Sequence, residues 1–273
     1  MGIRSNLAKF PLPLNVSEFK ATSLGARVLA NSFFKSGTHL LTRVLDLLPL
    51  IVPRWSYHIA VSESQIPYQD LGRIRNGQYS TAHLYWHPEL VEILDTHNIR
   101  TLFIIRDPRD IAVSYSYYIT HMLRSHPLSP YFNSLTSDAE RLMATIVGVD
   151  KNLAPDGNRW KSIGEHAIAY APWLDESTCL TVRFEDLVGS AGGGNDEKQV
   201  ETVRAIISHL GIELSNNQIH EIASKAFFKK ANTFRKGQIG DWKNHFLEEH
   251  KRAFKEVAGE AIIKYGYADG YDW

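Results

Sequence analysis

Cysteine is almost missing from this sequence. The 273 residues include one, Cys179, and a single thiol cannot form a disulfide within the chain. This excludes the small secreted proteins that disulfides hold together. Cys179 lies in the apolar run STCLTVRF, so we expect a buried strand position rather than a reactive thiol. The first ten residues, MGIRSNLAKF, lack the apolar core of a signal peptide, and we therefore expect a cytoplasmic protein.

Excess charge and long apolar runs are missing as well. Thirty basic and thirty acidic residues balance to a net charge of zero, so composition predicts no nucleic-acid partner and no polybasic membrane contact. The most apolar stretch, VLDLLPLIV (44–52), contains Asp46 and Pro49. It is far shorter than the roughly 20 residues that a membrane-spanning helix needs. No membrane span is expected.

Apolar runs of strand type alternate along the chain with helix-type patterns. This alternation predicts one α/β domain over residues 1–273, with a central, mostly parallel sheet flanked by helices. Residues 49–80 show no clear period, and no strand is predicted there. The predicted strands are 26–34, 100–108 and 177–187, and the predicted helices are 38–48, 87–99, 108–123, 162–174, 196–211 and 215–228, with a helical patch at 137–148.

The segment FKSGTHLL (34–41) follows the first predicted strand and opens a helix. Gly37 permits an unusual backbone angle, and the amides of 36–39 can converge on an anion beside the charge of Lys35. Ser36, Thr38 and His39 add side-chain donors. The Walker A pattern is absent because the lysine precedes the only glycine, which argues against an ATPase or GTPase. An ordinary strand-to-helix turn is the alternative for this stretch alone.

Two further segments could bind an anion. In FIIRDPRDIAVSYSYY, Arg106 leaves the second strand and Ser114 lies two helical turns onward, so both could reach one phosphate. The alternative is that Arg106 pairs with Asp107 or Asp110 on the surface. In FRKGQIGDWKNHF (234–246), Arg235, Lys236 and Gly237 form a cationic turn, for which a solvated basic loop is the simpler explanation.

Together these segments resemble the cytosolic-type sulfotransferase family. Its motifs read roughly P-K-S-G-T-T-W, R-[DN]-P-[KR]-D-x-x-V-S-x-Y and R-K-G-x-x-G-D-W-K-N, and VRFEDL (182–187) is similar to its Y-E-D-L segment. The resemblance covers about residues 27–246. It implies a fold with a P-loop-like phosphosulfate-binding loop and a sulfotransferase that uses 3′-phosphoadenosine 5′-phosphosulfate (PAPS) and releases adenosine 3′,5′-bisphosphate (PAP).

The resemblance also implies roles for individual residues. The loop Lys35-Ser36-Gly37-Thr38-His39 would hold the 5′-phosphosulfate, with Lys35 neutralising charge on the bridging oxygen. The 3′-phosphate would be bound by Arg106, Ser114, Arg235, Lys236 and Gly237. Ser114 and Lys35 are counted with the catalytic residues. No metal is implied, because fixed cations neutralise the charge.

A base must take the proton of an acceptor hydroxyl. The family motif K-[ST]-H-[LF]-P is similar to STAHLYWHP, which nominates His83 as catalytic, with His87 as its rival. Two histidines at this spacing on a helix could also bind zinc, but no third ligand is near and Pro88 disturbs the helix.

Several positions depart from the family pattern. His39-Leu40 replaces Thr-Trp, so the tryptophan that would stack on adenine is missing, and Thr81 replaces the lysine two residues before the base. Phe184 and Phe227 are the remaining candidates for an adenine contact. The family's C-terminal dimer motif is not matched in KNHFLEEHKR, so the family dimer is not assumed.

The leading prediction is therefore transfer of a sulfuryl group from PAPS to a small-molecule alcohol, phenol or glycan hydroxyl by in-line displacement. A P-loop-type kinase and a non-catalytic protein that binds PAP or PAPS are the alternatives. Aromatic residues in 50–80 and 120–165 fit a phenol, a lipid-like alcohol or a sugar equally well.

Overall fold

A computed structural model describes residues 25–61, 65–227 and 237–273. Its centre is a sheet of five strands in the order β2-β3-β1-β4-β5, and every neighbouring pair is parallel. Parallel strands need crossover connections, which the helices between them supply. The α/β class and the central parallel sheet are thus confirmed.

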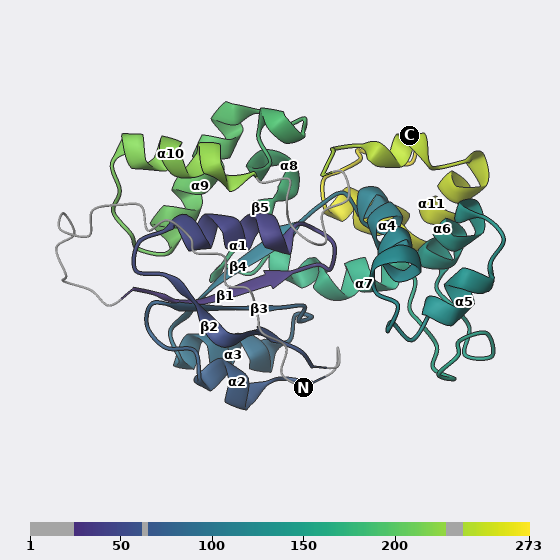
Figure 1. Ribbon diagram of the computed structural model, residues 1–273, viewed down its shortest axis with the longest axis horizontal. Coiled ribbons are helices and arrows are strands. Elements are labelled where there is room, and N and C mark those ends of the chain that lie inside the picture. The colour runs from purple at the N-terminus through teal and green to yellow at the C-terminus, as the bar shows by residue number, and fades with distance from the viewer. Residues whose placement is uncertain (1–24, 62–64, 228–236) are drawn as a thin grey trace, which may run out of the picture.

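The strands and helices follow one another along the whole described chain (Figure 1). The strands are β1 (Arg27–Ser32), β2 (Val52–Ile59), β3 (Gln78–Ala82), β4 (Ile99–Ile105) and β5 (Cys179–Arg183). The helices are α1 (Thr38–Leu47), α2 (Tyr68–Gly72), α3 (Pro88–Thr96), α4 (Pro108–Tyr117), α5 (Ser129–Ser134), α6 (Asp138–Val147), α7 (Ile163–Tyr170), α8 (Phe184–Leu187), α9 (Asp196–His209), α10 (Asn216–Ala226) and α11 (Glu248–Lys264).

Both faces of the sheet are buried, which is usual for parallel sheets. On β1, Val28 and Ala30 pack with α1, α9 and α10, whereas Leu29 belongs to a second core with α3, α7 and α11. The alternation follows the two-residue period of a strand. In Figure 1, α1, α9 and α10 accordingly lie above the sheet, α2 and α3 lie below it, and α4, α5, α6 and α11 form a group at one end.

The sequence prediction missed β2 and β3, which lie in the stretch that shows no period. β3 is short, and although four of its five residues are buried, its sequence QYSTA is largely polar, so no apolar run marks it as a strand. β2 is interrupted: its register with β3 shifts between Pro53 and His58. An interrupted strand cannot show the regular alternation by which strands are recognised.

Two predicted elements end earlier than expected. The strand predicted to 187 ends at Arg183, and Phe184–Leu187 forms the short helix α8. The helix predicted over 108–123 is α-helical only to Tyr117, and Tyr118–Met122 continues as a π-helical turn. Single π-helical turns occur often at functional sites.

Within the described residues, none of the helices is both long and apolar enough to cross a bilayer.

Candidate active site

The carboxyl ends of the parallel strands bring most of the predicted site residues to one edge of the sheet. Lys35 follows β1, His83 follows β3, Arg106 follows β4 and Phe184 follows β5. β1 lies between β3 and β4, so the predicted base and the predicted phosphate-binding arginine flank the loop that carries Lys35. Ligands of open α/β sheets bind at this edge.

The loop after β1 has an unusual backbone. Lys35 and Gly37 both lie in the left-handed region, with φ angles of 62° and 107°. For a lysine this conformation costs of order 1–3 kcal/mol, and such strained residues cluster at functional sites. Gly37 is the N-cap of α1, and a Cβ atom there would lie 2.7 Å from Cδ2 of Phe184. Glycine therefore lets the loop approach the start of α8 closely.

Ser36 anchors this loop to the sheet. Its hydroxyl donates to the Ile104 carbonyl at 2.7 Å, and its N–H donates to the Phe33 carbonyl at 3.1 Å. The N–H groups of the first turn of α1 need partners from outside the helix, as at every helix start. The arrangement suits an anion at the start of α1.

The Lys35 ammonium lies 4.0 Å from the centre of the Tyr118 ring. Tyr118 is the first residue of the π-helical turn after α4. A cation over an aromatic face is attracted by the ring's electron density. The π-helical turn thus lies against the side chain of Lys35.

His83 is held by the end of β1. Its Nδ1 lies 2.9 Å from the Ser32 carbonyl oxygen and 3.0 Å from the Ser32 hydroxyl. A carbonyl oxygen only accepts hydrogen bonds, so Nδ1 carries the proton and donates. Nε2 of the neutral ring is then unprotonated. The Ser32 hydroxyl also contacts the Thr38 hydroxyl at 2.8 Å, which links His83 to the start of α1.

The surroundings keep His83 neutral. The pKa of His83 is lowered to about 4, chiefly by burial and also by the nearby His58, Lys35 and His39, while the bond to Ser32 acts in the opposite direction. His39, which begins α1 with Thr38, also has a lowered pKa, first through desolvation and then through Lys35. Lys35, His39 and His83 therefore share one electropositive site.

Arg106 is a buried cation with unused donor capacity. Its side chain is 9% exposed, it donates to the Gln238 carbonyl at 2.7 Å, and it pairs with Asp110 at 3.3 Å. Its guanidinium lies 4.4 Å from the centre of the Phe184 ring. Nε of Arg106 is buried and has no hydrogen-bond partner among the described residues. A buried donor without a partner is costly unless a ligand satisfies it.

Asp110 ties the segment after residue 236 to α4. Its carboxylate accepts the N–H groups of Gly240 at 2.8 Å and Trp242 at 2.9 Å, in addition to its pair with Arg106. The alternative prediction was a pair for Arg106 on the surface. Arg106 does pair with Asp110, but the pair is buried, because Asp110 is 1% exposed. Asp107 pairs instead with Arg109, at 2.8 Å.

The sequence model of the family described as "Sulfotransferase domain" matches residues 26–266. The chain belongs to this family. The match spans the loop after β1, His83, Arg106 and the segment that Asp110 holds, so it confirms the family and the sulfotransferase class predicted from the motifs.

Curated members of the family are distant relatives of this sulfotransferase. Sulfotransferase 6B1 of zebrafish (Danio rerio) is 26% identical over 59% of the chain, a match that spans about half (51%) of that protein's length. Sulfotransferase 6B1 of mouse is 25% identical over 86% of the chain and 76% of its own length.

Solved structures share the fold of this sulfotransferase. Mouse sulfotransferase SULT7A1, crystallised with PAP, superposes with a TM-score of 0.62 at 21% identity, over 89% of both chains. Retinol dehydratase in complex with retinol and PAP gives a TM-score of 0.56 at 16% identity, over 90% of this chain and 82% of its own. At these identities the likeness shows the fold.

The other predicted site residues of this sulfotransferase lie as follows. Ser114 is partly buried in the second turn of α4, and Phe227 is the C-cap of α10. Gly237 begins the last described range, whereas Arg235 and Lys236 lie outside the described residues. His87, the rival base, is the N-cap of α3 and accepts the Glu89 N–H at 3.2 Å, which is a structural task.

Sequence reasoning missed two features of this site. His58 on β2 contacts the His83 ring, with ring centres 5.3 Å apart, but its stretch of chain carried no recognisable pattern. The sequence indicates Tyr118 only as part of a helix and as one of many aromatic residues for the acceptor pocket, because nothing in the sequence marks a π-helical turn.

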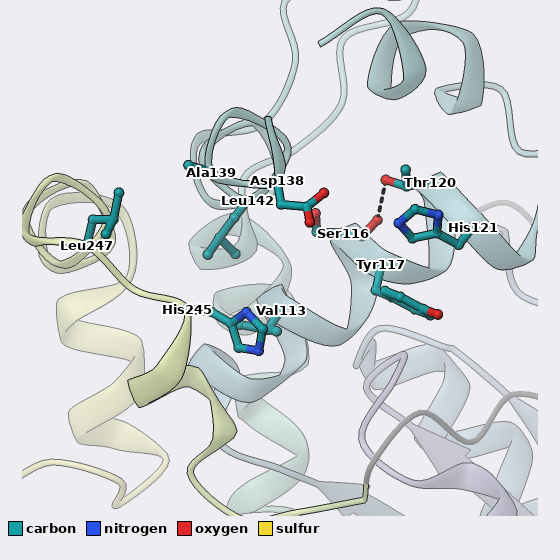
Figure 2. A pocket seen from close by; sticks show the side chains of 10 residues that line it. All are labelled: Val113, Ser116, Tyr117, Thr120, His121, Asp138, Ala139, Leu142, His245 and Leu247. Carbon is teal, nitrogen blue, oxygen red and sulfur yellow. Dashed lines mark hydrogen bonds between the residues drawn. The ribbon is translucent and has the colours of Figure 1, made fainter. Parts of the chain in front are cut away.

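A separate pocket of about 170 Å³ lies on another side of α4, between α6 and the segment before α11 (Figure 2). Its polar lining includes Asp138, His245 and Ser116, whose carbonyl accepts the Thr120 hydroxyl at 2.8 Å. None of the predicted site residues lines this pocket. In the part of the chain that is described, His, Cys, Asp and Glu side chains form no group of three that could hold a metal ion.

Proposed function

We propose that this chain transfers the sulfuryl group of PAPS to a hydroxyl of a small alcohol, phenol or glycan, with His83 as the general base. PAPS supplies the sulfuryl group, and the PAP bound to two solved neighbours supports it as donor. The observation that carries the proposal is the arrangement of His83, with Nδ1 bound to the Ser32 carbonyl beside the Lys35 loop.

The geometry of His83 suits proton abstraction. Nδ1 is committed to Ser32, so the acceptor's proton is taken at Nε2, and the bond to Ser32 holds the ring in that tautomer. The lowered pKa of His83 keeps the ring neutral near pH 7, which is the form that a base requires.

The cations would act at the two ends of the donor. Lys35, with Gly37, Thr38 and His39 at the start of α1, would neutralise the charge that develops on the bridging oxygen. Arg106 Nε, which has no partner among the described residues, fits the 3′-phosphate beside the Ser114 helix. The Phe184 ring beneath Arg106, together with Phe227, is our candidate for the adenine contact. The Ser36 hydroxyl is already bonded to the Ile104 carbonyl of the sheet. We therefore propose that Ser36 acts by holding the shape of the loop.

Several broader predictions stay proposals. We propose that residues 1–273 form one sulfotransferase domain, that the protein is cytoplasmic, and that Arg235, Lys236 and Gly237 complete the 3′-phosphate site. Retinol, bound to one solved neighbour, supports a small-molecule hydroxyl acceptor.

The decisive experiment is a transfer screen. The purified chain is incubated with sulfur-labelled PAPS and phenols, hydroxylated lipids, glycans and tyrosyl peptides, with EDTA present. We expect label on at least one hydroxyl compound. PAP binding without transfer to any acceptor would point to the non-catalytic alternative. In a parallel incubation with labelled ATP and magnesium in place of PAPS and EDTA, transfer would point to the kinase.

We expect the acid limb of the kcat/KM profile to fall near pH 4 rather than near pH 6.5. Burial and the neighbouring cations lower the pKa of His83 to about 4, so the base stays neutral until the pH approaches that value. Initial rates from pH 3.5 to 8 report the ionisation in the free enzyme. Samples returned to pH 7 must regain full activity, and an acid limb centred at or above pH 6.5 would contradict the assignment.

A further inference from the structure

One carboxylate joins three segments beside the proposed 3′-phosphate site. Glu185 follows Phe184 in α8, and its Oε1 accepts the N–H of Asp107 at 3.0 Å. Its Oε2 accepts the hydroxyl of Tyr267 at 2.8 Å, in the segment that follows α11. Neither Glu185 nor Tyr267 is among the predicted site residues. Glu185 thus fastens the loop after β4 and the segment after α11 to α8.

The bond to Asp107 fixes the residue before it. The N–H of Asp107 belongs to the planar peptide group that follows Arg106, so holding this N–H holds the backbone from which the Arg106 side chain departs. Phe184, whose ring lies 4.4 Å from the Arg106 guanidinium, is 5% exposed and packed in the core. Phe184 is therefore held by its own packing, and Glu185 ties the backbone of Arg106 to this fixed point.

The surroundings of Glu185 make its hydrogen bonds costly to lose. Burial raises the pKa of the Glu185 carboxyl, while its two hydrogen-bond donors and the nearby Arg106 act in the opposite direction. Burial and the charge of Glu185 raise the pKa of Tyr267 well above its usual value, so the hydroxyl keeps its proton and stays a donor near pH 7. A polar group with little access to water depends on such partners.

Arg109 reinforces the same junction. It pairs with Asp107 at 2.8 Å and donates to the carbonyl of Tyr267 at 3.0 Å. Its guanidinium lies 4.2 Å from the centre of the Trp242 ring. We expect these contacts to keep the loop folded when the Glu185 side chain is changed, so the effect of Glu185 can be measured by itself.

We propose that Glu185 is a positioning residue for the donor, which holds Arg106 in the place where it receives the 3′-phosphate. The proposal rests on the proposed use of PAPS. Glu185 contacts no reacting atom, and its effect passes through the backbone of Arg106. Its loss should weaken donor binding and leave the chemical step unchanged, because Lys35 and His83 follow other strands, β1 and β3.

The experiment compares the affinities for PAP and for adenosine 5′-phosphate, which lacks the 3′-phosphate. We expect Glu185→Ala to weaken PAP binding by about tenfold to 100-fold, the range for a lost hydrogen bond of a charged group. Adenosine 5′-phosphate should bind within about threefold of wild type, and kcat at saturating PAPS should also stay within about threefold. Glu185→Gln keeps an oxygen acceptor for the Asp107 N–H and should bind PAP more tightly than Glu185→Ala.

A double-mutant cycle with Arg106→Ala tests whether Glu185 acts through Arg106. If it does, adding Glu185→Ala to Arg106→Ala should weaken PAP binding by less than about threefold more. Full multiplication of the two losses in the double variant would overturn the proposal. An equal loss for PAP and adenosine 5′-phosphate would overturn it too, since that pattern indicates a general disturbance of the fold.

Tyr267→Phe removes only the hydroxyl that Glu185 accepts, and should weaken PAP binding by about threefold to tenfold. This variant tests the same carboxylate if thermal transitions show that Glu185→Ala does not fold. The matched controls are Glu213→Ala and Tyr271→Phe, which change an exposed carboxylate and an exposed tyrosine and should bind PAP like wild type.

The outcomes separate this proposal from the proposed function. Wild-type transfer and PAP binding, with full PAP affinity in folded Glu185→Ala or in folded Tyr267→Phe, would overturn the role of Glu185 alone. Absence of both transfer and PAP binding in wild type would instead overturn the proposed function, and this proposal with it.

Discussion

We expect His83→Ala to lower kcat by about 100-fold to 10,000-fold while leaving PAP affinity unchanged. A positioned base contributes a rate factor of this order. The loss should appear in kcat rather than in PAP binding, because the imidazole contacts Ser32 at the end of β1 while Arg106 lies beyond β4. Labelled transfer measures the rate, and isothermal titration with PAP measures the affinity.

His87→Ala is the matched control, since it removes an imidazole four residues away. His87 caps α3 through its bond from the Glu89 N–H, so its loss should cost about 1 kcal/mol of stability and leave kcat unchanged. Loss of turnover in His87→Ala with full turnover in His83→Ala would reverse the assignment of the base.

We expect Arg106→Ala to weaken PAP binding by ~100-fold, corresponding to about 3 kcal/mol for a lost charged hydrogen-bonding group. Arg106 is buried, its Nε has no partner among the described residues, and it also holds the Gln238 carbonyl. Replacing Arg106 therefore removes the proposed contact with the phosphate. It also removes the hydrogen bond that holds the segment around Gln238. Titration calorimetry measures the affinity directly.

One further variant separates charge from geometry at this position, and a second serves as the control. Arg106→Lys keeps the charge but loses the guanidinium fork, and should bind PAP about tenfold more weakly than wild type. Arg204→Ala removes an exposed arginine of α9 and should bind like wild type. Full PAP affinity in a folded Arg106→Ala protein would remove Arg106 from the phosphate site.

The family was readable from the chain alone. Local motifs carry that information: the loop around Gly37, the arginine that leaves β4 and the segment around Trp242 each need particular residues in a fixed order. Alternating strand and helix patterns likewise predicted the α/β class. Both signals are local in sequence, so they survive without knowledge of the fold.

Only the tertiary structure decided which side chains meet. His58 reaches His83 through an irregular strand, and no periodic pattern records such an interruption. Tyr118 reaches Lys35 through a π-helical turn that has no sequence signature. The hydrogen bonds of His58 and His83 reach Thr81 and Ser32, which lie 23 and 51 residues away in sequence. These contacts depend on strand register, and register is set by the packing of the whole sheet.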